Sequence, residues 1–258
     1  FQVVGAQNAA DAERLRNLGC GTDAVYITGN LKFDGARPDP VRRLDPEAIL
    51  RQLGVPAGAR VIVAGSTHDG EEAILAEQFQ RLRKKFPDLF LILVPRHFER
   101  AKAVVADLNA RGVKFQLRSE MTPETRRAAG EVDCLLVNTT GELKYFYEVA
   151  TVVFVGKSLT AEGGQNPIEP AALGKALVFG PNMQNFRPVV ATFRERDAVM
   201  QVADAMGVEA AFEELLGNPA RREQLGRNAA AVVQENQGAT QRTVDVILER
   251  LPEAIRKT

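Results

Sequence analysis

The chain has 258 residues, 45% of them hydrophobic and 26% charged, and its formal net charge is +0. This composition is typical of a globular protein with a full core, and the neutral balance argues against a basic surface for nucleic acid. No apolar run approaches the roughly 20 residues that span a bilayer. Cys20 and Cys134 lie far apart in the sequence, which predicts reduced thiols that serve packing in a cytoplasmic protein.

The first 34 residues predict a βαβ unit that is too small to stand alone. A short strand is followed by a helix capped by Asn8 and by a second strand over 25–28. Because the chain opens inside a strand without Met, we expect 1–34 to be the truncated end of an N-terminal Rossmann-like domain. The Pro-rich stretch that follows predicts a linker over 35–45. Lys32, just before it, is expected to contact an anion across a cleft.

Beyond the linker, apolar runs alternate with amphipathic segments. The predicted strands are 61–65, 89–94, 113–117, 134–137, 152–155, 176–180 and a weak 199–202. The predicted helices are 46–53, 70–85, 97–111, 142–149, one from Pro167, one after Asn185 and three that end near Leu251. Strands that are apolar throughout predict a doubly wound α/β fold with a parallel sheet over 46–240, followed by a C-terminal helix over 241–258. Such folds bind ligands beyond the carboxyl ends of the strands.

Polar residues collect in the loops that follow the predicted strands, which is where doubly wound folds bind ligands. Arg96 follows a strand and a proline, so its backbone is constrained, and its guanidinium can hold phosphate or carboxylate through two parallel hydrogen bonds. His97 is equally well explained as a helix-start residue. Glu142 is equally well explained by charge compensation in the first turn of a helix. The aromatic run Tyr145–Tyr147 predicts core and groove wall, and the acidic run Asp69–Glu72 predicts charge at a helix N-terminus.

The most informative segment is Gly163-Gly164-Gln165-Asn166-Pro167-Ile168-Glu169-Pro170-Ala171-Ala172. Its glycines let the backbone approach a ligand, while Asn166 is placed to cap a helix and Pro167 to start it. The free amides and the dipole of such a helix start attract phosphate. Glu169 would repel phosphate, so its expected partner is a pair of hydroxyls. A phosphate beside a ribose diol predicts a nucleotide.

Other chemistries lack their motifs. The two histidines, His68 and His97, have no zinc-binding spacing, so no metal site is expected. No Gly-x-Gly-x-x-Gly follows a strand and no Walker A motif occurs, which argues against dinucleotide redox chemistry and P-loop ATP hydrolysis. Ser66 is not in a Gly-x-Ser-x-Gly elbow.

A series of segments shares one further property: their order and spacing match a known family over nearly the whole chain. They are TGNLKFD at 28–34, GSTHDGEE at 65–72, LVPRH at 93–97, GEL at 141–143, FVGKSL at 154–159, GGQNPIEPAA at 163–172 and FGPNMQNF at 179–186. In these segments the chain resembles the C-terminal portion of 3-deoxy-D-manno-octulosonic acid (Kdo) transferases, which add Kdo to a lipid A precursor. Several motifs in order are far more specific than any one of them.

The resemblance implies a GT-B glycosyltransferase: a C-terminal Rossmann-like domain, preceded here by the last βαβ piece of the N-terminal domain. This C-terminal domain would bind the donor, CMP-Kdo, with Glu169 on the ribose hydroxyls. The donor-binding residues expected from the loops and the resemblance together are Ser66, Thr67, His68, Pro95, Arg96, His97, Gly141, Glu142, Gly163, Gly164, Gln165, Asn166 and Glu169.

The resemblance also implies an inverting, metal-independent transferase that needs no cofactor besides its donor substrate. A hydroxyl of the lipid A precursor, lipid IVA, would displace CMP, whose phosphate Arg96 and the helix start at Asn166 would stabilise. The family's general base is a Glu of the N-terminal domain, which is missing here, so we expect this fragment to bind donor and to catalyse little alone. Acceptor and membrane contacts, at the cytoplasmic face of the bacterial inner membrane in lipopolysaccharide biosynthesis, are expected through that missing region.

Two positions depart from the family pattern. Thr140 stands where Met is usual, and Gln165 stands where His is common; Gln keeps hydrogen bonding but cannot carry a proton. Two alternatives stay open. One is another GT-B nucleotide-sugar enzyme, such as a UDP-sugar transferase or epimerase, and the other is a noncatalytic nucleotide-binding module.

Overall fold

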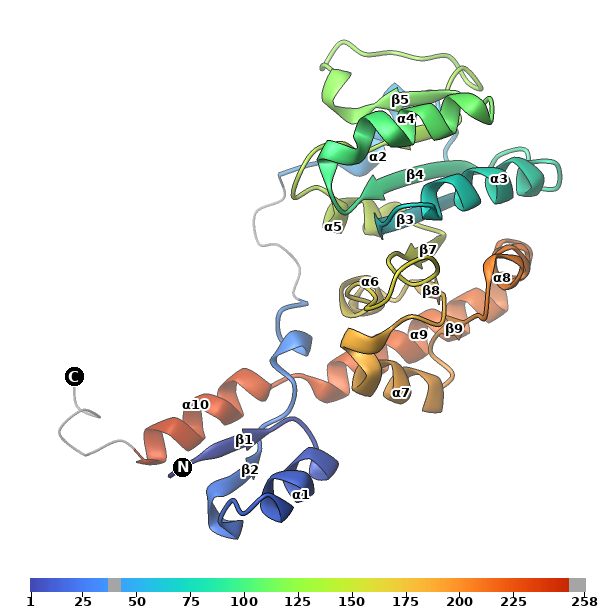
Figure 1. Cartoon of the computed structure of the whole chain (residues 1–258). Helices are drawn as coiled ribbons and strands as arrows, with labels where there is room; N and C mark the ends of the chain where they lie inside the picture. Colours follow the sequence, from blue (N-terminus) through green and yellow to red (C-terminus); the bar gives the residue numbers. More distant parts are fainter. Residues whose placement is uncertain (37–42, 251–258) are drawn as a thin grey trace. The chain divides into compact units, whose positions relative to one another are not determined.

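The computed structural model describes residues 1–36 and 43–250, and the chain divides into two compact units (Figure 1). The first unit joins both ends of the chain, Phe1–Pro38 and Val233–Thr258, and the second is Asp39–Val232. The predicted linker over 35–45 falls largely outside the described residues. No helix within the described ranges is both long enough and apolar enough to cross a membrane.

The first unit contains the predicted βαβ arrangement. Strands β1 (Val4–Ala6) and β2 (Val25–Ile27) pair in parallel, and α1 (Ala9–Asn17) connects them. Asn8 caps α1 as expected, because its side-chain oxygen accepts the amide hydrogen of Asp11 at 2.9 Å. Two short 3₁₀ turns, η1 (Thr22–Ala24) and η2 (Leu31–Phe33), lie on either side of β2.

The C-terminal helix α10 (Ala239–Arg250) belongs to this first unit, so it does not stand apart as the predicted division at 241 implied. Asp34 is buried, and its carboxylate accepts the amide hydrogens of Gly238 (2.6 Å) and Thr240 (2.5 Å) at the start of α10. The guanidinium of Arg242 donates to the carbonyl of Thr28 at 2.9 Å. Thus the 28–34 segment, which we expected to contact a ligand through Lys32, holds a helix from the other end of the chain.

The second unit is built on one parallel sheet with the strand order β5-β6-β4-β3-β7-β8-β9. The strands are β3 (Val61–Thr67), β4 (Phe90–Pro95), β5 (Phe115–Leu117), β6 (Cys134–Leu136), β7 (Val152–Val155), β8 (Ala176–Phe179) and β9 (Met200–Gln201). From β3 the chain runs outward through β4 in one direction, then returns to β7 and runs outward in the other. The order therefore reverses between β3 and β7, where doubly wound folds open a binding crevice.

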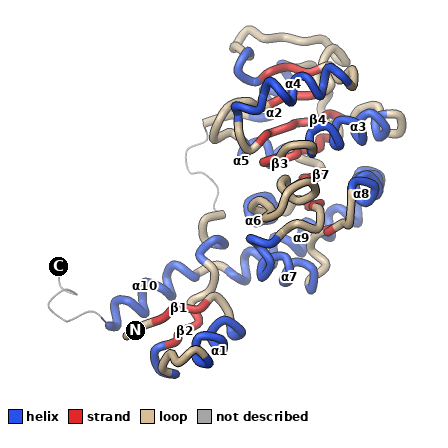
Figure 2. The backbone as a smooth tube through the Cα atoms, viewed as in Figure 1, coloured by secondary structure: helices blue, strands red, loops and turns tan. Residues whose placement is uncertain are grey.

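Helices cover both faces of this sheet, as expected (Figure 2). They are α2 (Pro46–Gln52), α3 (Glu71–Arg83), α4 (Ala101–Ala110), α5 (Leu143–Phe146), α6 (Ile168–Ala172), α7 (Arg187–Glu195), α8 (Ala205–Gly217) and α9 (Pro219–Asn236), with 3₁₀ turns η3 (Phe98–Arg100), η4 (Arg118–Glu120), η5 (Tyr147–Val149) and η6 (Gln184–Phe186). One face packs on α3, α4, α8 and α9 through side chains such as Ile62 and Phe212. On the opposite face, Gly65 lies against Leu143 and Tyr147 of α5 and η5.

Three local features differ from expectation or refine it. The helix predicted over 142–149 is a single α-turn, α5, that tightens into η5. Helix α6 begins at Ile168, one residue after Pro167, and is only 5 residues long. Cys134 is buried in β6, and this burial raises the pKa of its thiol, which keeps it protonated and inert, in agreement with a packing role.

We predict that Asp34→Ala frees the start of α10, because two amides lose the carboxylate that caps them. The expected cost is about 1–2 kcal/mol in the local opening free energy of this helix, seen as faster hydrogen exchange of its amides. Asp45→Ala is the matched control, since Asp45 caps α2 in the other unit. It should speed exchange in α2 and leave α10 unchanged. Unaltered exchange of α10 in Asp34→Ala would contradict the capping role.

Candidate functional site

A cavity of about 530 Å³ lies at the carboxyl ends of the strands around the switch point. Its lining comes from the loops after β3, β4, β6 and β7, which are four of the loops in which polar residues were expected to gather. The lining residues are Ser66, Arg96, Gly141, Leu143, Lys144, Tyr147, Gln165, Asn166 and Glu169. The strand order brings together loops that are up to about a hundred residues apart in sequence.

The wall after β3 is shaped by an irregular strand end. Ser66 adopts a left-handed backbone conformation with φ 55°, and the pairing of β3 with β4 shifts its register between Gly65 and Thr67. This kink turns Ser66 toward the cavity. Gly65 is required here, because a Cβ at this position would overlap the hydroxyl of Tyr147.

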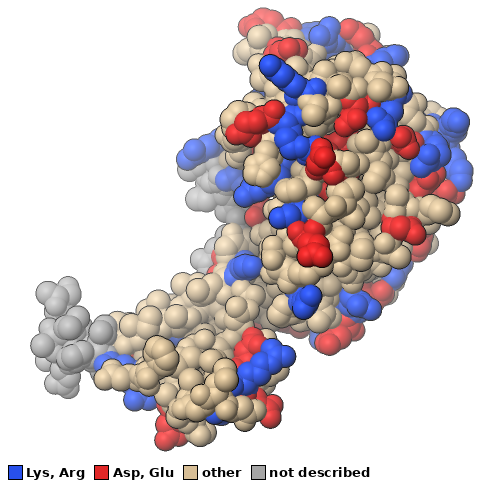
Figure 3. Space-filling model, in the orientation of Figure 1, with Lys and Arg blue, Asp and Glu red and all other residues tan. Residues whose placement is uncertain are grey.

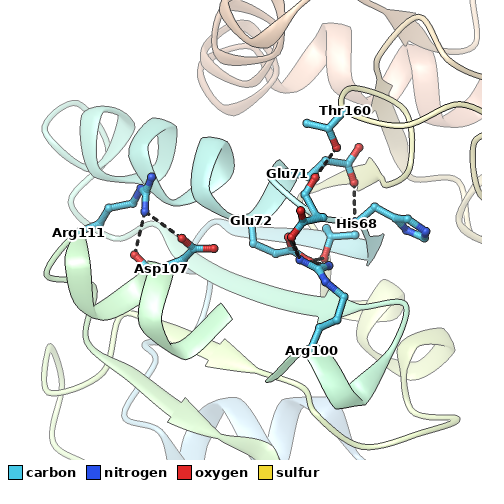
Figure 4. Close-up of polar contacts among 9 residues, drawn as sticks. His68, Glu71, Glu72, Arg100, Asp107, Arg111 and Thr160 are labelled. Carbon is cyan, nitrogen blue, oxygen red and sulfur yellow. Dashed lines mark hydrogen bonds and ion pairs between the residues drawn. The ribbon is translucent and has the colours of Figure 1, made fainter. Parts of the chain in front are cut away.

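The buried carboxylate of Glu71 joins the loops on the two sides of the switch point. Glu71 is 0% exposed at the start of α3. It accepts the amide hydrogens of His68 (2.8 Å), Lys157 (2.8 Å), Ser158 (2.8 Å) and Leu159 (3.0 Å), and Figure 4 shows its contact with His68. Four donors from two loops compensate the burial of the charge. The acidic run thus supplies more than the helix N-terminal charge that we expected.

Glu72 is also buried, and it connects the end of β3 to the turn η3 that follows β4. Its carboxylate accepts a hydrogen bond from the hydroxyl of Thr67 at 2.8 Å. It also accepts hydrogen bonds from the guanidinium of Arg100 at 2.8 and 3.2 Å (Figure 4). The same guanidinium also pairs with Asp69 at 2.8 Å. Arg100 therefore ties η3, which follows β4, to the turn between β3 and α3, and so fixes the backbone that carries Arg96.

The double glycine allows close packing and does not present free amides. Gly163, Gly164 and Gln165 donate their amide hydrogens to Gln184, Lys157 and Gly156 respectively. Both glycines have positive φ, and a Cβ at Gly164 would meet the backbone and sulfur of Met183. These three amides are therefore unavailable to a ligand, and α6, which begins at Ile168, is only 5 residues long.

Glu169 and Arg96 present their charges to the cavity. Glu169 is exposed, and its carboxylate accepts the Asn166 side-chain amide at 2.9 Å, while the Asn166 oxygen accepts the amide hydrogen of Ile168 at 3.0 Å. Asn166 thus orients the carboxylate and begins the turn that precedes α6. The Arg96 guanidinium is exposed, with no hydrogen-bonding or ionic partner among residues 1–36 and 43–250. A cation and a carboxylate available in one cavity can recognise a ligand that carries both an anion and hydroxyl groups.

Six of the predicted site residues line this cavity: Ser66, Arg96, Gly141, Gln165, Asn166 and Glu169. The others support its walls or lie beside it. Pro95 is buried at the end of β4, and Thr67 is buried with its hydroxyl hydrogen-bonded to Glu72. Gly163 and Gly164 belong to the loop that precedes Gln165. The carboxylate of Glu142 is held by Arg118 at 3.0 Å and by the hydroxyl of Thr139, so it is occupied away from the cavity lining.

The two histidines contact each other edge to face, with ring centroids 5.7 Å apart. Burial, followed by the nearby cation of Lys157, lowers the pKa of His68 below its ordinary value of 6.5. His68 is therefore a neutral imidazole near pH 7. Its buried Nδ1 has no hydrogen-bond partner in the described part of the chain.

Leu143, Lys144 and Tyr147 line the cavity but were absent from the predicted set. The sequence predicts Tyr147 in the core and in the groove wall. Both predictions hold, because the residue is only 3% exposed and also lines the cavity. A signal for all three was present: they follow Gly141 directly, in a loop already assigned to the ligand edge.

Charges of both signs are interspersed on the face shown in Figure 3. Within the described ranges, no group of three or more His, Cys, Asp or Glu side chains is arranged to hold a metal ion. The charged side chains that line the cavity are those of Arg96, Lys144 and Glu169.

Comparison with known proteins gives relatives in both sequence and structure. The chain is 35% identical over 249 residues to a 3-deoxy-D-manno-octulosonic acid transferase of Haemophilus influenzae, covering 96% of this chain and 56% of that protein. The C-terminal CMP-Kdo binding domain of WaaA from Acinetobacter baumannii superposes with a TM-score of 0.66 at 30% identity, over 73% of this chain and 96% of that domain. No protein-family model matches.

A UDP-GlcNAc 2-epimerase of Neisseria meningitidis, bound to UDP-GlcNAc, superposes with a TM-score of 0.61 over 96% of this chain and 61% of that protein, at 15% identity. That likeness concerns the fold alone. The parallel sheet and its two helical layers are those of a GT-B C-terminal Rossmann-like domain. The chain spans little more than half the length of the Haemophilus relative.

We predict that Glu71→Gln destabilises the second unit by about 3 kcal/mol, because the amide group of Gln faces backbone donors that the carboxylate had satisfied. Urea unfolding measures the change. Glu77→Gln on the same helix is the control: Glu77 is half exposed and pairs with Arg111 at the surface, so its loss should cost less than about 1 kcal/mol. Equal effects of the two substitutions would refute the role given to Glu71.

We also predict a pH dependence from His68. Its pKa is lower in the folded protein than the unfolded value of 6.5, so the unfolded chain binds the proton first. The stability that neutral His68 contributes is complete above pH 6.5 and is lost as the pH falls through the folded pKa. NMR titration of the imidazole signals, assigned with His97→Gln and His68→Gln, should give a His68 midpoint below 6.5. A midpoint at or above that value would contradict this.

Proposed function

Because the chain belongs to the 3-deoxy-D-manno-octulosonic acid transferase family, we propose that its cavity binds the nucleotide-sugar donor CMP-Kdo. In this proposal the chain is mainly the donor-binding half of a glycosyltransferase that moves Kdo to a lipid A precursor. The observation that carries it is the cavity itself, which Arg96 and the hydrogen-bonded pair Asn166 and Glu169 line together.

The carboxylate of Glu169 suits the ribose of the donor. A ribose offers two neighbouring hydroxyl donors, and a carboxylate accepts hydrogen bonds without donating any. Glu169 is exposed to the cavity, and its recorded side-chain hydrogen bond, with Asn166, leaves lone pairs for a ligand. A phosphate at the same oxygen atoms would be repelled, which assigns the anion to another part of the cavity.

Arg96 suits the single phosphate of the donor. Its guanidinium can form two parallel hydrogen bonds to phosphate oxygens, and its backbone is held by the amide hydrogen bond from Arg96 to Thr67 at 3.0 Å. Lys144, which contacts the ring of Tyr145, adds a second positive charge to the lining. In this proposal Arg96 and Lys144 contact the phosphate. The amides of Gly163 and Gly164 cannot, because they are already hydrogen-bonded within the protein.

The reaction that follows is displacement at the anomeric carbon. A lipid A precursor hydroxyl forms the new C–O bond as the bond to CMP breaks, and Arg96 stabilises the negative charge on the departing phosphate. We propose that the proton acceptor is a Glu of an N-terminal domain of the whole protein. We propose that the acceptor lipid and the cytoplasmic face of the bacterial inner membrane are likewise contacted through that domain of the whole protein.

We predict that Glu169→Ala weakens CMP binding at least tenfold, since a charged hydrogen-bond acceptor to the ribose is worth about 1.5–3 kcal/mol. Isothermal titration calorimetry of the 258-residue chain with CMP measures the change. Glu162→Ala is the control: Glu162 is exposed in the same loop but does not line the cavity.

UMP and UDP are titrated in parallel. Binding of CMP in preference to both supports the donor assignment. Preference for UDP would contradict the CMP-Kdo assignment and would indicate a UDP-sugar as the donor. Unchanged CMP affinity in Glu169→Ala would overturn the role of this carboxylate.

A further inference from the structure

Tyr147 contributes a phenol side chain to the wall of the cavity. Tyr147 is only 3% exposed and lines the cavity together with Glu169. No hydrogen bond to its Oη is recorded from any residue in 1–36 or 43–250. Gly65 makes room for this atom, because any larger residue there would overlap it.

A hydroxyl at a cavity wall that has no protein partner is available to hydrogen-bond a ligand. Phe would fill the same volume without offering that hydrogen bond. The ring of Tyr147 packs in the core like its neighbour Phe146, so the ring alone does not explain the oxygen. A ligand that occupies the cavity would give the hydroxyl its partner.

Tyr147 is a hydrogen-bond donor at every physiological pH. Burial, and then the negative charge of Glu169, raises the pKa of its phenol well above the ordinary value of 10.0. Tyr147 and Glu169 line the same cavity. An O–H donor beside a carboxylate acceptor complements a sugar diol, in which each hydroxyl both donates and accepts.

We propose that Tyr147 is a specificity-determining residue that donates a hydrogen bond to a ribose hydroxyl of the bound nucleotide while Glu169 accepts one from the same diol. This rests on the proposed donor site and deepens it. The pair distinguishes ribose from deoxyribose: a nucleotide without one hydroxyl leaves either the phenol or the carboxylate unpaired inside the cavity.

The test compares Tyr147→Phe with the unaltered chain by calorimetry, using CMP, 2′-deoxy-CMP and 3′-deoxy-CMP. We expect Tyr147→Phe to weaken CMP binding about fivefold, the effect of one hydrogen bond. The variant should bind at least one deoxy analogue as tightly as the unaltered chain does, because the hydroxyl that Tyr147 contacts is already absent from it. Tyr145→Phe is the matched control: Tyr145 is similarly buried two residues earlier but does not line the cavity. It should leave all three affinities unchanged.

Each result has one meaning. Equal CMP affinity in Tyr147→Phe and the unaltered chain overturns the inference, although the donor site stands. An equal loss for CMP and for both deoxy analogues also overturns it, since the phenol then contacts the base or the phosphate. Failure of the unaltered chain to bind CMP refutes the donor site, and the inference with it. Thermal denaturation of both Phe variants verifies that the fold is kept.

Discussion

The buried carboxylate of Glu71 is the interaction on which the site depends. It receives four backbone amides, one from the turn after β3 and three from the turn after β7, and these two strands are neighbours at the point where the sheet order reverses. Parallel sheets leave the loops at this point divergent, so something must hold them at a fixed separation. A fully buried charge with four donors does so rigidly, because any movement of either turn leaves a charged group or an amide unsatisfied.

The walls of the cavity follow from that constraint. Gly65 and Gly156 allow the two turns to approach, since a Cβ at Gly156 would overlap the backbone of Ser66. Beyond them, Gly164 packs on Met183, and Ser158 joins β7 to the loop after β8 by accepting the amide hydrogen of Gly180 at 3.0 Å. Gly65, Gly156 and Gly164 therefore serve backbone packing around the site, whereas the side chains of Arg96, Glu169 and Tyr147 belong to residues that line the cavity.

The two ends of the chain share a unit for a different reason. Asp34 and Thr28 supply acceptors to α10 and its first turn, so the 28–34 segment, in which the sequence suggested a ligand contact at Lys32, caps and docks a helix. Local sequence cannot separate these roles. An Asp after a glycine-containing turn is equally suited to cap a neighbouring helix or to meet a ligand, and the choice depends on which helix arrives there.

The amino-acid sequence by itself determined the alternation of strands and helices, the parallel sheet and the edge at which polar loops gather, because periodicity and apolar runs are local properties. It also placed Arg96 and Glu169 at that edge. Tertiary structure alone decided that Arg118 pairs with Glu142, that Glu71 joins two turns 86 or more residues apart, and that Tyr147 lines the cavity. Each of these depends on contacts between segments that only the folded sheet brings together, and no spacing along the chain encodes them.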